Sequence, residues 1–161
     1  MVIKSLILAL ALTMTVTISA EEKKANESVA KEATTSKEKA KEMVNKGAAF
    51  AKKNGLDALL KEINEKKTFT DGELYLFAID KKCVTLAHGA NKGLIGKDQT
   101  NLVDADGKAF FQEFVKVATT KGSGWVDYKW SNPTTKKIQE KTTYIFAVPG
   151  MDLILGCGIY K

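Results

Sequence analysis

One lysine in the second half of the chain has surroundings that suit the binding of a small anion. Lys141 lies in a strand-like segment of mostly apolar residues, between Glu140 and Thr142. An ammonium group that is partly buried in such a segment needs a counter-charge, and the carboxylate of a ligand supplies one. The alternative interpretation is a solvent-exposed lysine at the edge of a sheet, which is a common arrangement.

Aromatic side chains in two other strand-like segments are candidates for the walls of a pocket. Tyr128 and Trp130 alternate along one segment, so both point to the same face of their strand. Tyr75 and Phe77 share one face of an earlier strand and would form the floor. A phenol or an indole offers an apolar surface with one polar group, which suits a small ligand. Trp125 points to the opposite face and is expected in the core, which is also the alternative interpretation for the other four.

The single histidine, His88, ends a strand-like segment and stands before a long loop. Its imidazole can donate a hydrogen bond to a ligand oxygen. The alternative is a histidine whose hydrogen bonds are satisfied by the backbone of its own loop. Tyr144 is a secondary candidate for the pocket. The predicted ligand-binding residues are therefore Tyr75, Phe77, His88, Tyr128, Trp130 and Lys141.

The residue types needed for covalent catalysis do not come together in the sequence. Cys83 and His88 are five residues apart on a predicted strand, so their side chains would point to opposite faces. No third group that could orient the histidine is evident. We therefore expect a binding protein without catalytic residues and not an enzyme.

A partial calcium-binding pattern precedes the helix that follows the long loop. Asp104, Asp106, Gly107 and Glu113 have the spacing of part of an EF-hand loop. Leu102, however, occupies the first ligand position, where an acid is required. A helix cap at Asp106 explains the acidic residues better. No metal site and no cofactor are expected.

Residues 1–20 have the features of a secretory signal peptide that is removed on export. Lys4 supplies the positive charge, an apolar run follows from Leu6 to Ile18, and a small residue, Ala20, ends it. An uncleaved membrane anchor is the alternative, although the apolar run is short for a membrane span, which needs about 20 residues. The protein is therefore expected to be periplasmic or secreted.

The charge balance argues against a nucleic-acid partner. The chain has 25 Lys+Arg and 19 Asp+Glu residues, and all the basic ones are lysines. Arginine is the preferred residue for bidentate recognition of bases and phosphates. Many of the lysines also alternate with glutamates, as on a solvated surface.

The two cysteines leave two interpretations open. Cys83 and Cys157 both lie in strand-like segments. In an oxidising compartment they can form a disulfide if their geometry permits one. Two buried free thiols are the alternative.

The charged residues 21–36 are interpreted as a tether or the start of a helix, and residues 37–161 as a single domain. An amphipathic helix becomes credible from Ser36 onward. A shorter helix with Leu59 and Leu60 on its inner side follows.

Five strand-like segments and one further helix complete the domain. Turn signals such as Asp71-Gly72 and Pro149-Gly150 separate them. The loop at 89–106 is longer than a plain connection, and the helix after it has Phe110 and Phe114 in one apolar row. The strands are expected at residues 73–80, 83–88, 125–130, 139–148 and 152–160. This order predicts an α+β fold in which a long N-terminal helix packs on a five-stranded antiparallel sheet.

Several phrases of the sequence occur in the order found in a known family. They are ELYLFAID (73–80), LAHGANKGLIGKD (86–98), DADGKAFFQEFV (104–115), GWVDYKWSNP (124–133), EKTTYIFAV (140–148) and ILGCGIY (154–160). With these phrases the chain resembles the single Cache domain of the second type, a PAS-like extracellular sensor module. The resemblance implies a ligand pocket that is lined by one face of the sheet. It also implies that the loop and helix between the second and third strands cover this pocket.

The same resemblance implies a small organic acid, such as a short carboxylate, as the ligand. We therefore predict an exported small-molecule binding protein that recognises such an acid. Members of the family are usually the sensory parts of chemoreceptors and histidine kinases, so a membrane chemoreceptor or a histidine kinase is a candidate partner. A homodimer through the N-terminal helix is a candidate assembly. The chain ends at Lys161 directly after a strand-like segment, and we expect no output domain of its own.

A protein-interaction module is the alternative function. In that case the Lys/Glu-rich N-terminal helix would dock on a membrane receptor or another envelope partner, and the domain would have no ligand of its own. A pull-down from envelope extracts with and without residues 21–40 separates the two functions.

Overall fold

The computed structural model describes residues 20–161, so the predicted signal peptide lies outside the described residues apart from Ala20. The chain divides into two compact units, residues 1–32 and residues 33–161. In its described part, the first unit consists of the first turns of α1, which spans Ala20–Asn54. Within the described range, no helix has both the length and the apolar character needed to cross a membrane.

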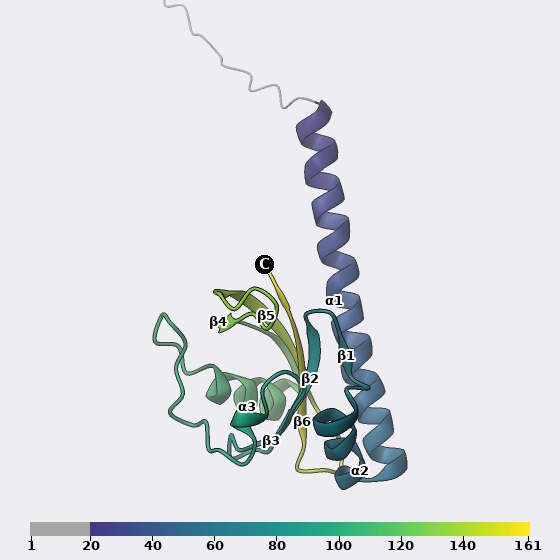
Figure 1. Ribbon diagram of the computed structural model, residues 1–161, viewed down its shortest axis with the longest axis vertical. Helices are drawn as coiled ribbons and strands as arrows, with labels where there is room; N and C mark the ends of the chain where they lie inside the picture. The colour runs from purple at the N-terminus through teal and green to yellow at the C-terminus, as the bar shows by residue number, and fades with distance from the viewer. Residues whose placement is uncertain (1–19) are drawn as a thin grey trace, which may run out of the picture. The chain divides into compact units, whose positions relative to one another are not determined.

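The second unit has helices on both faces of an antiparallel sheet (Figure 1). The remainder of α1 is followed by α2 (Leu56–Lys61), a π-helical turn (Glu62–Lys66) and, much later in the chain, α3 (Phe110–Lys121). The strands are β1 (Thr70–Asp71), β2 (Leu74–Ile79), β3 (Thr85–His88), β4 (Ser123–Ser131), β5 (Ile138–Ala147) and β6 (Ile154–Tyr160). A 3-10 turn (Lys92–Leu94) lies in the long loop before α3.

The strand order in the sheet is β1-β2-β6-β5-β4, and β3 also pairs with β2. All of these pairs are antiparallel. The predicted α+β fold is therefore confirmed, and the five expected strands correspond to β2–β6. The two-residue strand β1 was not predicted. It arises because the Asp71-Gly72 turn, with Gly72 in the left-handed region at a φ of 58°, folds Thr70 back beside Tyr75.

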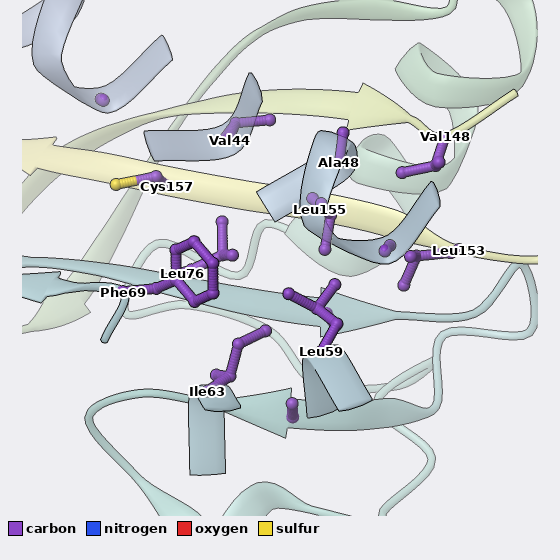
Figure 2. Close-up of a cluster of buried hydrophobic side chains, with 14 of the residues drawn as sticks. Val44, Ala48, Leu59, Ile63, Phe69, Leu76, Val148, Leu153, Leu155 and Cys157 are labelled. Carbon is purple, nitrogen blue, oxygen red and sulfur yellow. The ribbon is translucent and has the colours of Figure 1, made fainter. Parts of the chain in front are cut away.

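One face of the sheet is covered by α1 and α2 through a continuous apolar core (Figure 2). In α1 the buried alanine and valine residues recur every three or four positions, as expected for one stripe of a helix: Ala40, Val44, Ala48 and Ala51. Gly47 brings α1 very close to the sheet, because a Cβ atom at this position would lie 2.5 Å from Leu76 Cδ2. Helix α1 therefore packs directly on β2 and β6.

The opposite face of the sheet carries a second, mainly aromatic core under α3. Its buried helical members are Phe110, Phe111, Phe114 and Ala118. The sheet contributes Tyr75 and Phe77 from β2 and Val126 and Tyr128 from β4. The predicted inward row of α3 is therefore confirmed, and this face holds the predicted pocket residues.

Both cysteines are free thiols, and they belong to different cores. Cys157 lies in the core between the sheet and α1, whereas Cys83 lies in the aromatic core. Because the sheet separates the two side chains, the interpretation as buried free thiols holds and the disulfide does not form.

Candidate ligand-binding site

The pairing register of the sheet brings the predicted site residues together on the face under α3. Lys141 on β5 lies directly opposite Tyr128 on β4 and Tyr160 on β6. On the far side of β6, Phe77 of β2 lies opposite His88 of β3. Since alternate residues of a strand share a face, Tyr75 and Trp130 also point to this side. All six predicted residues are thus on one face.

Lys141 is fully buried, with 1% of its surface exposed, because β5 is an interior strand between β4 and β6. The alternative of a solvent-exposed edge lysine is therefore wrong. Its Nζ donates a hydrogen bond of 2.6 Å to the Tyr75 hydroxyl and one of 3.4 Å to the Tyr160 hydroxyl. Nζ also lies 3.9 Å and 4.6 Å from the centroids of these two rings. Among residues 20–161, no carboxylate lies within 4.0 Å of this ammonium group.

Burial without a counter-charge changes the protonation of the whole cluster. It lowers the pKa of the Lys141 ammonium from 10.5 to about 7, because the charged form loses its hydration. Burial raises the pKa of Tyr160 to about 12 and that of Tyr75 well above 10. The two phenols therefore remain neutral, while the lysine is divided between its charged and neutral forms near neutral pH.

Two glycines of β6 make space for the site. A Cβ atom at Gly158 would lie 2.4 Å from Lys141 Cε and 2.2 Å from Thr143 Oγ1. A Cβ atom at Gly156 would lie 2.2 Å from Cζ of Phe77. The alternating glycines therefore allow the lysine and the phenylalanine to lie flat across the central strand.

One imidazole nitrogen of His88, Nδ1, binds the backbone of the following loop, and the other, Nε2, has no hydrogen bond within residues 20–161. Its Nδ1 accepts hydrogen bonds from the backbone N–H groups of Ala90 and Asn91, at 3.3 and 2.9 Å. The imidazole is neutral, because burial and the nearby Lys141 lower its pKa to about 3. The single proton therefore resides on Nε2, which has no hydrogen-bond partner among the described residues. This N–H group is available to a ligand oxygen.

Aromatic rings surround a very small cavity between the sheet and α3. The cavity has a volume of about 10 Å³ and is lined by Phe77, His88, Phe110, Phe111, Phe114, Tyr128 and Trp130. The Tyr128 hydroxyl is satisfied by Thr143 Oγ1 at 3.1 Å. The rings of His88 and Phe77 are stacked with 5.9 Å between their centroids. The space is barely large enough for one water molecule.

A larger cavity of about 230 Å³ adjoins this site at the end of the sheet. It shares His88 and Trp130 with the small cavity, and Tyr75 forms another wall. Its outer rim belongs to the β4–β5 turn, which is held by the buried Asn132. The amide of Asn132 donates to Glu73 Oε1 at 2.7 Å and accepts from the N–H of Thr134 at 2.8 Å. The two cavities are therefore neighbours at His88 and Trp130.

Sequence reasoning missed Tyr160, Thr143 and the two glycines, because strand register decides which residues lie beside Lys141 and Phe77. It also assigned Phe110 and Phe114 to the core only. Tyr144 was wrongly considered for the pocket. Its ring packs on Trp125 with 5.4 Å between centroids, in the core on the α1 side. Alternation from Lys141 would have placed it there, since the two residues are separated by an odd number of positions.

The acidic residues before α3 form a loop anchor. Helix α3 begins at Phe110, with Ala109 at its N-cap position, so the predicted cap at Asp106 is wrong. Asp104 instead accepts hydrogen bonds from the backbone N–H groups of Asp106, Lys108 and Lys129, each at 2.9 Å. These bonds attach the loop to β4. In the part of the chain that the structure describes, no group of three or more His, Cys, Asp or Glu residues is arranged to hold a metal ion.

The position of Cys83 also differs from the prediction. It lies in a turn with a left-handed φ of 63°, and β3 begins two residues later. The turn interrupts the alternation, so Cys83 packs in the same aromatic core as Phe77. The predicted placement of Cys83 and His88 on opposite faces is therefore wrong. Burial raises the pKa of the Cys83 thiol, which disfavours the thiolate that a nucleophile requires.

A long helix on one face of an antiparallel sheet, with a second helix on the other face, is the architecture that the resemblance to a Cache domain predicted. The profile of the family described as Cache domain (dCache_2) matches residues 2–161. The chain belongs to this Cache family. Its members are extracellular or periplasmic sensor domains of chemotaxis receptors and histidine kinases, which implies that the domain senses a small molecule.

Two curated relatives match the chain over part of its length. It is 32% identical over 90 residues, 56% of the chain, to methyl-accepting chemotaxis protein McpP of Pseudomonas putida (strain KT2440). It is 27% identical over 86 residues, 53% of the chain, to sensor histidine kinase MctS of Rhizobium johnstonii. The matched regions make up 16% and 18% of those proteins, so the chain spans less than a fifth of their length.

A solved structure supports the same fold over most of the chain. It is the structure of a Cache chemosensory domain described for carboxylic acid recognition, and it is 25% identical to this chain. The similarity covers 89% of this chain and 99% of that domain, with a TM-score of 0.63. The fold of this chain is therefore that of a Cache domain.

Proposed function

We propose that this protein is an exported sensor domain that binds a small carboxylate under α3, with Lys141 as its charge partner. One observation carries the proposal: the Lys141 ammonium is buried on the aromatic face without a carboxylate within 4.0 Å among the described residues. A buried charge is costly unless it is paired, and a ligand carboxylate would supply the pair. The similarity to a Cache domain named for carboxylic acid recognition supports this ligand class.

Each neighbouring group has its own role in the recognition of such an acid. The Lys141 ammonium balances the negative charge, and the N–H of His88 Nε2 donates to one carboxylate oxygen. The neutral hydroxyl of Tyr75, 2.6 Å from Lys141 Nζ, keeps the ammonium in place. Phe77, Tyr128 and Trp130 surround the apolar part of the ligand.

The remaining features fit sensing without chemistry. The proposed organisation is a signal peptide at residues 1–20, a charged tether or helix start at 21–36, which lies within α1, and one Cache domain at 37–161. A neutral phenol, a neutral imidazole and a lysine can bind an acid without making or breaking a covalent bond, so we propose no catalytic role. The receptor and kinase relatives support a membrane chemoreceptor or a histidine kinase as the partner that responds to the bound state.

Titration calorimetry of the purified protein with acetate, propionate, lactate and succinate tests the proposal. We expect saturable binding of at least one acid and loss of binding in Lys141→Met. The matched control is Lys137→Met, which removes an exposed lysine near the same end of β5. It should bind like the wild type. Equal affinities of the wild type and Lys141→Met, or no binding of any acid by the wild type, would refute the proposal.

A further inference from the structure

The cavity under α3 is too small for any of the proposed ligands. Its volume of about 10 Å³ corresponds to one water molecule, whereas even a short acid has several non-hydrogen atoms. A ligand held at His88 in the adjoining cavity of about 230 Å³ can therefore extend between these rings only if one of them moves. The space that opens when this ring moves limits the length of the ligand that the site can hold.

Two of the rings on the sheet, those of Tyr128 and Phe77, are held in place. Tyr128 is held by its hydrogen bond to Thr143, and its strand is paired with β5 along its whole length. Phe77 lies against the backbone of Gly156 and belongs to a strand that is paired on both sides. A shift of the Tyr128 ring would break its hydrogen bond to Thr143, and a shift of the Phe77 ring would remove its contact with Gly156.

Phe110, of which only 1% is exposed, lies on a helix and not on a strand of the sheet. It is the first residue of α3, and the N-cap residue Ala109 makes no side-chain capping hydrogen bond. The chain before it is irregular and is attached to β4 through Asp104, so a shift of the first turn of α3 would break no strand pair. Its ring stacks on Tyr128 with 4.5 Å between centroids and an interplanar angle of 11°, and it lies 5.3 Å from the Trp130 ring.

From this contrast we infer that Phe110 sets the length of the acid that the site accepts, because its ring occupies the space that the ligand's carbon chain would enter. The inference rests on the proposed carboxylate function. A short acid needs only a small displacement of this ring. Each additional methylene group must displace it further from Tyr128 and Trp130, so affinity falls as the chain lengthens.

Titration calorimetry with acetate, propionate, butyrate, valerate and hexanoate tests the inference on the wild type, Phe110→Ala and Phe110→Leu. The wild type should prefer the shortest acids. Phe110→Ala should move the preference to longer acids and improve the affinity for valerate or hexanoate by on the order of tenfold, because each buried methylene contributes about that much. Phe110→Leu should give a smaller shift in the same direction, and it remains informative if the alanine variant does not fold.

The matched control is Phe69→Leu, which makes the same change to a buried phenylalanine in the core on the α1 side of the sheet. This variant should keep the chain-length preference of the wild type. If both Phe110 variants also keep that preference while the wild type binds short acids, the inference is refuted and the proposed function stands. If the wild type binds none of these acids, both are refuted.

Discussion

The Nζ atom of Lys141 lies 2.6 Å from the hydroxyl oxygen of Tyr75, a residue 66 positions earlier in the chain. Their strands, β5 and β2, are not neighbours, because β6 lies between them. The lysine side chain reaches across β6 at Gly158, where there is no side chain to block it. This contact places a basic group on an aromatic floor that none of the three strands could form alone.

The affinity for a carboxylate should fall as the pH rises above about 7. The pKa of Lys141 in the free protein is about 7, and only the charged ammonium attracts an anion. Above this value the affinity should decrease by up to about tenfold per pH unit, since each unit removes a further factor of ten of the charged form. Calorimetry from about pH 6 to about pH 9 measures this dependence. Equal affinities at both ends of the range would contradict the prediction.

Replacement of Lys141 by methionine should stabilise the ligand-free protein near neutral pH, by ~1–4 kcal/mol. The pKa of the lysine is about 7 in the folded state and 10.5 without burial. Between these values the unfolded chain binds a proton that the folded chain has released, so the wild type gains stability as the pH rises through this window. Urea unfolding at about pH 7 and about pH 10 should show the gain in the wild type and little of it in Lys141→Met. A destabilised variant would contradict this.

Gly158→Ala should reduce binding more than stability alone explains. The added Cβ would lie 2.4 Å from Lys141 Cε and 2.2 Å from Thr143 Oγ1, so the lysine must leave its position. Overpacking of this kind costs about 1–3 kcal/mol. Gly47→Ala is the control, because its Cβ would meet Leu76 at 2.5 Å in the core on the α1 side. Thermal unfolding should show a loss of stability in both variants, whereas calorimetry should show a loss of carboxylate affinity only in Gly158→Ala.

His88 should make the folded protein sensitive to mild acid. Its pKa is lowered from 6.5 to about 3, so below pH 6.5 the unfolded chain takes up a proton that the folded chain does not. Stability contributed by the neutral imidazole is therefore lost as the pH falls from about 6.5 towards 3, by up to about 1.4 kcal/mol per pH unit. His88→Asn keeps an acceptor for the N–H groups of Ala90 and Asn91 but cannot titrate. Its free energy of unfolding should fall less than that of the wild type between about pH 6 and pH 4, and an equal fall would count against this role.

The local sequence was sufficient to predict which residues share a face. Strand alternation placed Tyr128 with Trp130 and Tyr75 with Phe77, because successive side chains of a strand point to opposite faces of the sheet. Strand alternation failed at Cys83, where a left-handed turn replaces the strand. The predicted helix cap failed at Asp106, because the helix starts later. At Cys83 a tight turn overrides the local preference. Before α3, hydrogen bonds from Asp104 to the backbone of β4 do so.

The contacts between strands were decided by the tertiary structure. Nothing in the spacing of Lys141 and Tyr160 shows that they face each other, because register depends on how β5 and β6 align over their whole length. The burial of Lys141 follows from the interior position of β5 in the sheet. The sequence by itself therefore determined the order of the main helices and strands, the family and the kinds of side chain at the site. Only the folded sheet, by bringing distant strands into register, decided which of them surround the buried charge.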